Sequence, residues 1–239
     1  MINPLILKLE HHDVLSFEEK RVLESMISRV REFSADEDIA SQGSRLTESN
    51  LLLDGFAARY KILMNGRRQI TALHVIGDFV DLHSHLLKKL DHGVIALTPC
   101  QVAVVSHDSI RRITESHPHL TRLLWLSTLI DSATHREWLV AMGRRSALGH
   151  FAHLICELFL RLQAVQRTDG YSFQLPVTQA ELGDTLGIST VHVNRVVQEL
   201  RTERLITWQG DVVTILDWDR LIEVADFDPT YLSLERESR

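Results

Sequence analysis

Residues 189–198, STVHVNRVVQ, bring together side chains that can form hydrogen bonds with the edges of DNA bases. Arginine can donate two hydrogen bonds to guanine, asparagine and glutamine can each pair with adenine, and a small apolar side chain fits the thymine methyl group. In a helix, Val191, Asn194, Arg195 and Gln198 share one face, and an apolar stripe lies opposite. The pattern favours a DNA-reading helix over an ordinary amphipathic helix with a hydrated polar face. The candidate DNA-contacting residues are Thr178, Ser189, Thr190, Val191, His192, Asn194, Arg195 and Gln198.

The residues before this helix carry signals that would position it. Thr178 can cap a first helix, and Glu181, three residues later, completes a Thr-x-x-Glu capping box. Gly187 suits the left-handed conformation that ends a helix, and Ser189 can cap a second helix at once. So short a link makes the two helices cross steeply, which predicts a helix-turn-helix. The free N–H groups at the start of the second helix can also hold a DNA phosphate.

Two short apolar segments follow this helix pair. Residues 205–208 (LITW) and 212–215 (VVTI) flank a turn that contains Gly210, a pattern typical of a β-hairpin. A hairpin directly after the second helix predicts a winged helix-turn-helix.

The charge of this half of the chain is acidic. Residues 147–239 contain 8 Arg, no Lys and 14 Asp or Glu, so their formal charge is 8 − 14 = −6. The acidic residues gather in 211–237, whereas 185–198 contains Arg195 and no acidic residue. Because nonspecific DNA affinity depends on neutralising phosphates, we expect weak off-target binding and a reliance on base contacts and dimerisation.

The whole chain has the composition of a globular protein with room for two domains. Its 239 residues can bury a substantial core,. The most apolar run, 150–162, is interrupted by charged residues, and the N-terminus does not resemble a signal peptide. Cys100 and Cys156 lie far apart and suit small buried residues in a reducing compartment. We therefore expect a cytoplasmic protein without a membrane segment, a disulfide framework or a Cys-rich metal site.

The N-terminal half changes texture twice. Residues 16–33 begin with a serine cap and have helical periodicity, which predicts one helix. Between residues 36 and 105 short apolar strands alternate with hairpin turns such as Asn65-Gly66. Several short strands over ~70 residues predict a small antiparallel barrel or jelly roll. Residues 106–115 return to helical spacing.

A long helix is expected from Pro118 to about Met142. Its apolar stripe has few neighbours between a barrel and a helix-turn-helix, so a parallel helix from a second subunit would cover it. Packing on its own barrel is the alternative. Gly143 and two arginines then break the pattern, which places a hinge before a helix over 147–162. The candidate dimer-interface residues are Leu120, Leu123, Leu124, Ser127, Ile130, Thr134 and Ala141.

These segments predict an α+β fold in four parts. The parts are an N-terminal antiparallel, jelly-roll-like domain (1–115), which the family resemblance described next identifies as a β-roll sensor domain, a dimerisation helix with the hinge (116–145), a winged helix-turn-helix DNA-binding domain (146–219) and an acidic C-terminal tail (220–239).

This order of parts resembles the CRP/FNR family of bacterial transcription regulators, over residues 15–218. The resemblance is strongest in LPVTQAELGDTLGISTVHVNRVVQELRTERLI and, in the sensor, in LLLDGFAARY and NGRRQITALHVIGDFV. It implies a homodimer on a palindromic DNA site, with RNA polymerase as a further partner. The family's base-contacting positions fall on Thr190, Val191 and Arg195. The Glu that many members carry second in this set is replaced by Val191.

The sensor departs further from the cyclic-nucleotide-binding members that it resembles. Their Phe-Gly-Glu-Leu run corresponds to residues 79–82, and this chain has no arginine between Arg68 and Arg111 to pair with a cyclic phosphate,. We therefore expect no response to cyclic nucleotides. The oxygen-sensing branch needs four thiolates for its cluster, and this chain has two cysteines,. The candidate effector-pocket residues are Phe79, Val80, Asp81, Leu82 and His92.

Two other functions were weighed. His83, His85 and His92 could converge on a metal, although solvent-facing histidines are the simpler interpretation, and we predict no metal site and no cofactor. The sequence contains no phosphate loop, nucleophile elbow or zinc-protease helix,, so we predict no catalytic residues and no enzyme activity. The rival to a DNA-binding regulator is a small-molecule or metal sensor that acts through protein contacts and has a vestigial DNA-binding part.

Overall fold

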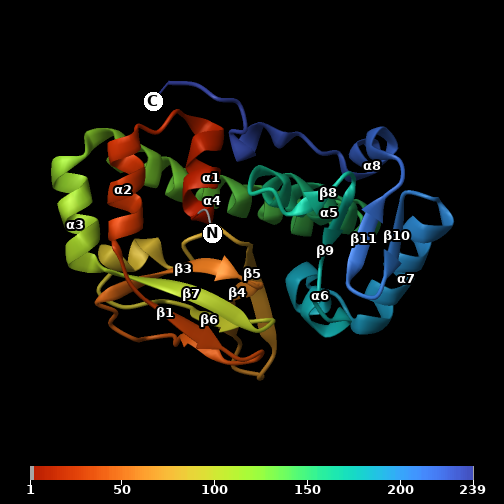
Figure 1. The fold of residues 1–239 in the computed structure, drawn as a ribbon. Coiled ribbons are helices and arrows are strands. Elements are labelled where there is room, and N and C mark those ends of the chain that lie inside the picture. The colour runs from red at the N-terminus through yellow and green to blue at the C-terminus, as the bar shows by residue number, and fades with distance from the viewer. Residues whose placement is uncertain (1–2, 239) are drawn as a thin grey trace.

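The computed structural model describes residues 3–238. Its helices are α1 (Pro4–His12), α2 (Phe17–Ser25), α3 (His107–Ser116), α4 (Pro118–Arg144), α5 (Ala147–Ala164), α6 (Gln179–Leu186), α7 (Thr190–Thr202) and α8 (Trp218–Ala225), with 3₁₀ helices η1 (Leu82–His85) and η2 (Pro229–Leu232). Its strands are β1 (Ile27–Phe33), β2 (Asp38–Ala40), β3 (Glu48–Asp54), β4 (Ala57–Ile62), β5 (Arg68–His74), β6 (Gly93–Ala96), β7 (Cys100–Ser106), β8 (Thr168–Asp169), β9 (Ser172–Gln174), β10 (Ile206–Gln209) and β11 (Val212–Ile215). Figure 1 shows a β-roll with helices along one side and a smaller unit at the far end of α4.

The predicted β-roll is confirmed. It contains two antiparallel sheets with the strand orders β1-β7-β3 and β2-β6-β4-β5. Buried Leu52 and Val102 from the first sheet pack in one cluster with buried Val94 from the second. β4 and β5 form the hairpin around Asn65-Gly66, in a register that pairs Ala57 with His74.

One predicted helix is partly a strand. Ser16 caps α2 with a complete capping box, as expected, but α2 ends at Ser25, and Ile27 begins β1. Strand β1 pairs with β7 along its length. This pairing is with residues 67 to 78 positions away, so it overrides a helical pattern that the local sequence does carry.

The long helix α4 is confirmed, but five of the seven residues assigned to the dimer seam are buried within this subunit. Leu120, Leu123 and Leu124 are fully or almost fully buried within this chain, in a cluster that includes Leu5 and Leu9 of α1. Thr134 and Ala141 are also buried, and Ser127 and Ile130 are half-buried. The physical reason is that α1, which the sequence analysis did not predict, covers this side of α4 together with α2 and α3 (Figure 1). The alternative, packing on its own subunit, holds for these residues.

Helix α1 has its own start signal. The Asn3 side chain accepts a hydrogen bond from the Leu5 backbone N–H, and Pro4 occupies the first helical position. Both features are typical of a helix N-terminus.

Residues 218–232 fold against the smaller unit, where a tail was expected from residue 220. α8 packs on α5, and Leu221, Ala225 and Leu232 are buried. The chain then returns to α1, where Arg236 Nε donates to the Glu10 carbonyl at 2.9 Å and the Glu237 N–H donates to the His12 carbonyl at 3.0 Å. The acidic residues of this segment had suggested a solvated tail, but its apolar residues decide its fold.

The two units share one hydrophobic core. Ile70 and Leu73 of the roll belong to the same buried cluster as Leu182 and Leu186 of α6. Strand β5 also holds α6 through polar contacts, described below. The smaller unit is therefore docked on the roll as well as joined to it through α4 and α5.

Candidate nucleic-acid interface and effector cavity

The predicted capping signals of the helix-turn-helix are confirmed. Thr178 Oγ1 accepts from the Glu181 N–H at 3.2 Å, and Glu181 Oε2 accepts from the Thr178 N–H at 2.6 Å. Gly187 ends α6 at φ +69°, a conformation that favours glycine, and Ser189 Oγ accepts from the His192 N–H at 3.3 Å,. Gly183 allows the turn to approach closely, because a Cβ there would lie 2.8 Å from the Ile188 carbonyl oxygen.

The two faces of α7 separate as the spacing predicted. Val193, Val196, Val197 and Leu200 are buried. Within residues 3–238 the side chains of Asn194, Arg195 and Gln198 make no hydrogen bond or ion pair, which leaves their donors open. All eight candidate contact residues are exposed: Thr178, Ser189, Thr190, Val191, His192, Asn194, Arg195 and Gln198.

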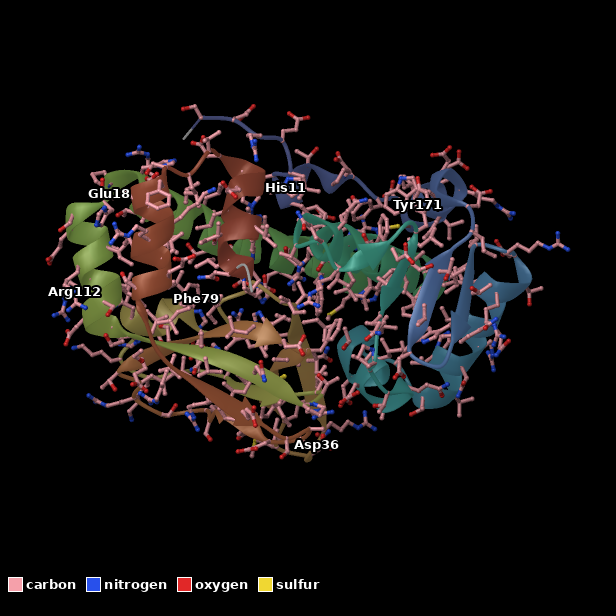
Figure 2. The ribbon with its side chains drawn as sticks, in the orientation of Figure 1. His11, Glu18, Asp36, Phe79, Arg112 and Tyr171 are labelled. Carbon is pink, nitrogen blue, oxygen red and sulfur yellow. The ribbon has the colours of Figure 1, made fainter. Side chains whose placement is uncertain are left out.

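The wing is fixed to the unit that carries α7. β10 and β11 pair around the predicted turn and continue into β9 and β8. The Trp208 ring of β10 stacks on Phe151 of α5, with ring centroids 6.1 Å apart. Tyr171 (labelled in Figure 2), in the turn between β8 and β9, stacks on Phe159 of α5 in the same way at 5.6 Å. Helix α5 is therefore the support on which both ends of this sheet rest.

Strand β5 of the roll holds the end of α6. Arg68 Nε lies 2.8 Å from Asp184 Oδ2, and Gln69 Nε2 donates to the carbonyl of Asp184 at 2.7 Å. Carbonyls at a helix C-terminus have no partner inside the helix, so a side chain of the roll supplies one. The turn before α7 is thus positioned by the sensor itself.

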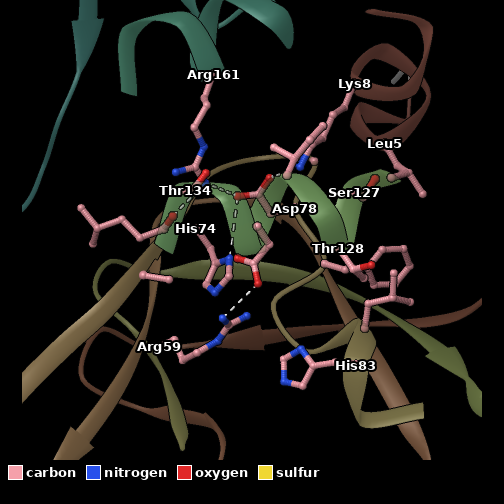
Figure 3. Close-up of a pocket in the computed structure, with 17 residues that line it drawn as sticks. Leu5, Lys8, Arg59, His74, Asp78, His83, Ser127, Thr128, Thr134 and Arg161 are labelled. Atoms are coloured by element: carbon pink, nitrogen blue, oxygen red, sulfur yellow. Dashed lines mark hydrogen bonds and ion pairs between the residues drawn. The ribbon is translucent and has the colours of Figure 1, made fainter. Parts of the chain in front are cut away.

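Two neighbouring cavities lie between the roll and α4. The inner cavity has a volume of about 60 Å³. Residues of α1, β5, α4 and α5 line it (Figure 3). The outer cavity is about 440 Å³ and is lined by β4, α4 and the loop that carries Asp91 and His92. Arg59 of β4 and Asp131 of α4 line both, and Arg59 Nη1 lies 3.1 Å from Asp131 Oδ2.

Comparison with known proteins agrees with this architecture. The cyclic nucleotide-binding domain matches residues 30–117, and the Crp-like helix-turn-helix domain matches residues 151–224. The chain belongs to the CRP/FNR family. It is thereby a DNA-binding transcription regulator and not an enzyme.

Relatives in the CRP/FNR family cover nearly the whole chain. The transcriptional activator protein FnrL of Cereibacter sphaeroides is 26% identical over 88% of this chain and 86% of its own length. The nitrogen fixation regulation protein FixK of Bradyrhizobium diazoefficiens is 28% identical over 87% of this chain and 86% of its own length. The structure of FixK2 from Bradyrhizobium japonicum has the same fold, with a TM-score of 0.74 and 23% identity over 82% of this chain and 96% of that one.

Three of the five predicted effector residues line a cavity, and the other two do not. Phe79 and Leu82 line the inner cavity and His92 lines the outer one. Val80 is fully buried in the core of the roll and lines neither cavity. Asp81 is also fully buried, where its carboxylate accepts from the Asn50 N–H and from Asn50 Nδ2, each at 2.6 Å. Burial raises the pKa of Asp81 to about 6. Asp81 is therefore committed to Asn50 and does not face a ligand.

The cavity residues that come from other elements were not predicted from the sequence. Arg59, His74, Asp131 and His135 line one cavity or both and belong to β4, β5 and α4. One signal was available, since Arg59 is a charged residue in a strand whose neighbours are apolar. Its pairing with α4, across 72 positions, has no local signature.

Two of the three histidines considered as metal ligands lie within contact distance of each other. His83 Nε2 lies 3.3 Å from His92 Nε2, and His92 Nδ1 lies 2.8 Å from Asp91 Oδ1. His85 instead packs edge-on against His107, at 5.3 Å between ring centroids. Burial lowers the pKa of His83 to about 4 and also lowers that of His92, so both rings are neutral at neutral pH. Within the described part of the chain, no three His, Cys, Asp or Glu side chains form a metal-ligand group.

The helices of residues 3–238 were compared with the requirements of a bilayer span, and none has both the length and the apolar character that such a span requires,.

Proposed function

We propose that this protein is a homodimeric regulator that reads a palindromic DNA site in the cytoplasm through α7 of each subunit and acts on RNA polymerase. The observation that carries the proposal is the outward face of α7. Its Asn, Arg and Gln donors are exposed and unengaged, while the opposite face is anchored in the core. The sensor would correspond to residues 1–115, the connecting helix to 116–145 and the DNA-binding domain to 146–219.

Site selection from random DNA tests this function. The full chain is mixed with random duplexes, and bound DNA is separated by gel shift, amplified and sequenced. We expect an enriched site with two inverted halves, about one helical turn apart from centre to centre. A protein that acts only through protein contacts, with a vestigial DNA-binding part, would enrich no such site.

We propose a different face of α4 for the dimer seam. Trp125, Leu129 and Leu139 are 64%, 52% and 70% exposed, and Val140 and Met142 are exposed beside them. Together with Ser132 and Arg136, the first three follow steps of four and three residues, the spacing of a two-stranded coiled coil. A second copy of the same helix would cover this apolar stripe, with Ser132 and Arg136 as polar positions within the seam.

We also infer that the sensor responds to a small molecule between the roll and α4, and that this molecule is not a cyclic nucleotide. Val80 fills space in the roll core, and Asp81 is committed to Asn50. Titration calorimetry with cyclic AMP and cyclic GMP should give no binding heat at physiological nucleotide concentrations. A micromolar dissociation constant for either nucleotide would contradict this part of the proposal.

A further inference from the structure

Arg59 is a buried cation with an incomplete set of partners. The residue is 7% exposed, and its Nη1 lies 3.1 Å from Asp131 Oδ2 and 3.3 Å from His135 Nε2. Its Nη2 reaches only the Val80 carbonyl, at 3.5 Å, and its Nε is buried without any partner among residues 3–238. A guanidinium can offer two parallel N–H groups to one carboxylate or phosphate. The Asp131 carboxylate uses only Nη1.

The two members of this ion pair are not equally held. The Arg59 side chain is 9% exposed, whereas that of Asp131 is 38% exposed. Arginine stays charged in proteins, and a buried charge without a partner is strongly destabilising. Asp131 can therefore turn into solvent once another anion takes its place, while Arg59 stays buried and always requires an anion,.

The surroundings of Arg59 suit such an anion. The inner cavity is also lined by His74, whose buried Nε2 has no partner within the described residues, and by Lys8 and Arg161, which are already paired with Asp78 of the same cavity. The outer cavity, which is the larger one, contributes Lys61 and the hydroxyl groups of Thr71 and Thr128. Lys61 is paired with Asp91 at 3.1 Å, and Asp91 is well exposed and also hydrogen-bonded to His92.

We propose that Arg59 anchors a small anionic effector, a carboxylate or a phosphate, which enters through the outer cavity and takes the place of Asp131 on the guanidinium. This inference rests on the proposed function, since it names the ligand class of the proposed effector cavity. Asp131 lies on α4 between Leu129 and Ser132 of the proposed seam, so the exchange of anions acts directly on the helix that joins two subunits. Ligand binding and dimer geometry are thereby coupled through one ion pair.

The test compares anions on the full-length protein. Thermal unfolding and titration calorimetry are performed with inorganic phosphate and with succinate, each against sodium chloride at the same ionic strength. We expect at least one of the two to bind saturably and to raise the melting temperature. Which of the two binds tells phosphate ligands from carboxylate ligands.

Two variants of opposite sign give the decisive result. Arg59→Gln should lose the saturable binding. Asp131→Asn removes the competing carboxylate and should bind the same anion roughly tenfold more tightly, a difference of about 1.4 kcal/mol. Arg29→Gln is the matched control, because it removes an ion-paired arginine of the roll that lies outside both cavities, and it should bind as the wild type does.

Three results would overturn the proposal: no saturable binding of either anion to the wild type, equal binding to Arg59→Gln, or unchanged affinity in Asp131→Asn. If Arg59→Gln does not fold, the Asp131→Asn comparison decides alone.

DNA binding is measured on the same samples with the selected site. Failure to bind anions with intact DNA binding rejects only this inference, and loss of DNA binding with intact anion binding rejects only the proposed function.

Discussion

Arg195 extends from the outward face of α7 at the position where a guanine contact is expected. Arg195→Ala should weaken binding by about 1–3 kcal/mol per half-site and relax the preference at one base pair, since the bidentate pair with guanine is lost. Arg195→Lys keeps the charge but not the planar fork, so it should recover affinity for all sequences alike without recovering the base preference. Binding to the selected site and to its single-base variants measures both effects.

The matched control for Arg195 lies on the same helix. Arg201 is exposed but lies in the last turn of α7, away from the N-terminal residues of a recognition helix that contact bases,, and Arg201→Ala should leave the base preference intact. If Arg195→Ala also leaves the preference intact and lowers the salt dependence by about one phosphate contact, Arg195 touches the backbone and not a base.

Asp81 predicts a pH dependence of stability. Burial raises its pKa from 3.8 to about 6, so between these values the folded state binds more protons than the unfolded state. The free energy of unfolding contributed by this group therefore falls as pH rises through that window. Asp81→Asn removes the titration, so the variant should gain stability relative to the wild type from about pH 4 to about pH 6. Urea denaturation at several pH values checks this, and a constant difference between the two proteins would exclude it.

At the scale of elements, α4 has two apolar faces with different neighbours. Leu129→Glu or Leu139→Glu should place an unpaired charge in the proposed seam and yield folded monomers in light scattering. Leu124→Glu would instead place the charge in the core beneath α1 and should unfold the subunit. Leu63→Glu, at an exposed apolar position in the β4–β5 turn, serves as the control and should remain dimeric. A wild type that is monomeric at micromolar concentration would refute the seam.

Local signals explain which elements could be predicted. Within a few neighbouring residues the sequence encodes three features that were predicted correctly. These are the capping box at Thr178, the left-handed Gly187, and the separate apolar and polar faces of α7. β1 depends on its partner β7, so residues 27–33 alone did not reveal it. The apolar stripe of α4 was visible, but the choice of which face a second subunit covers depended on α1, a helix of the same chain.

The residues of the two cavities could not be predicted from local sequence for the same reason. Its charged residues come from α1, β4, α4 and α5, so no stretch of sequence contains them together. Phe79 and His92 were predicted because they belong to the segment that resembles the family's effector region. Arg59, which that segment does not include, has a buried Nε without a partner among the described residues.

At the scale of the whole molecule, Arg161 ties the DNA-binding unit to the sensor. From α5 it donates to Asp78 at 2.6 Å, to the Leu73 carbonyl at 2.8 Å and to Glu157 at 2.9 Å. Glu157 is fully buried and also accepts from the side chains of Trp138 and Tyr231. Although burial opposes it, the cations Lys8 and Arg161 hold the pKa of Asp78 well below its usual value. Two buried carboxylates thus depend on one arginine.

Replacing this arginine should destabilise both units together. Arg161→Met keeps much of the side-chain volume but removes the cation, and it should lower the free energy of unfolding by about 3–5 kcal/mol. Arg167→Met, at a half-exposed residue whose nearest carboxylate is 3.9 Å away, should change it by less than about 1 kcal/mol. Urea denaturation followed by tryptophan fluorescence measures the free energy of unfolding of both variants. Equal changes in the two would show that Arg161 stabilises the protein no more than an exposed arginine does.

The return of the chain to α1 also sets an order of events during synthesis. Arg236 and Glu237 bind the backbone of Glu10 and His12, across 226 positions in the case of Arg236. These contacts form only after everything between them has left the ribosome. Until residues 236 and 237 have been synthesised, the Glu10 and His12 carbonyls at the end of α1 lack these two partners.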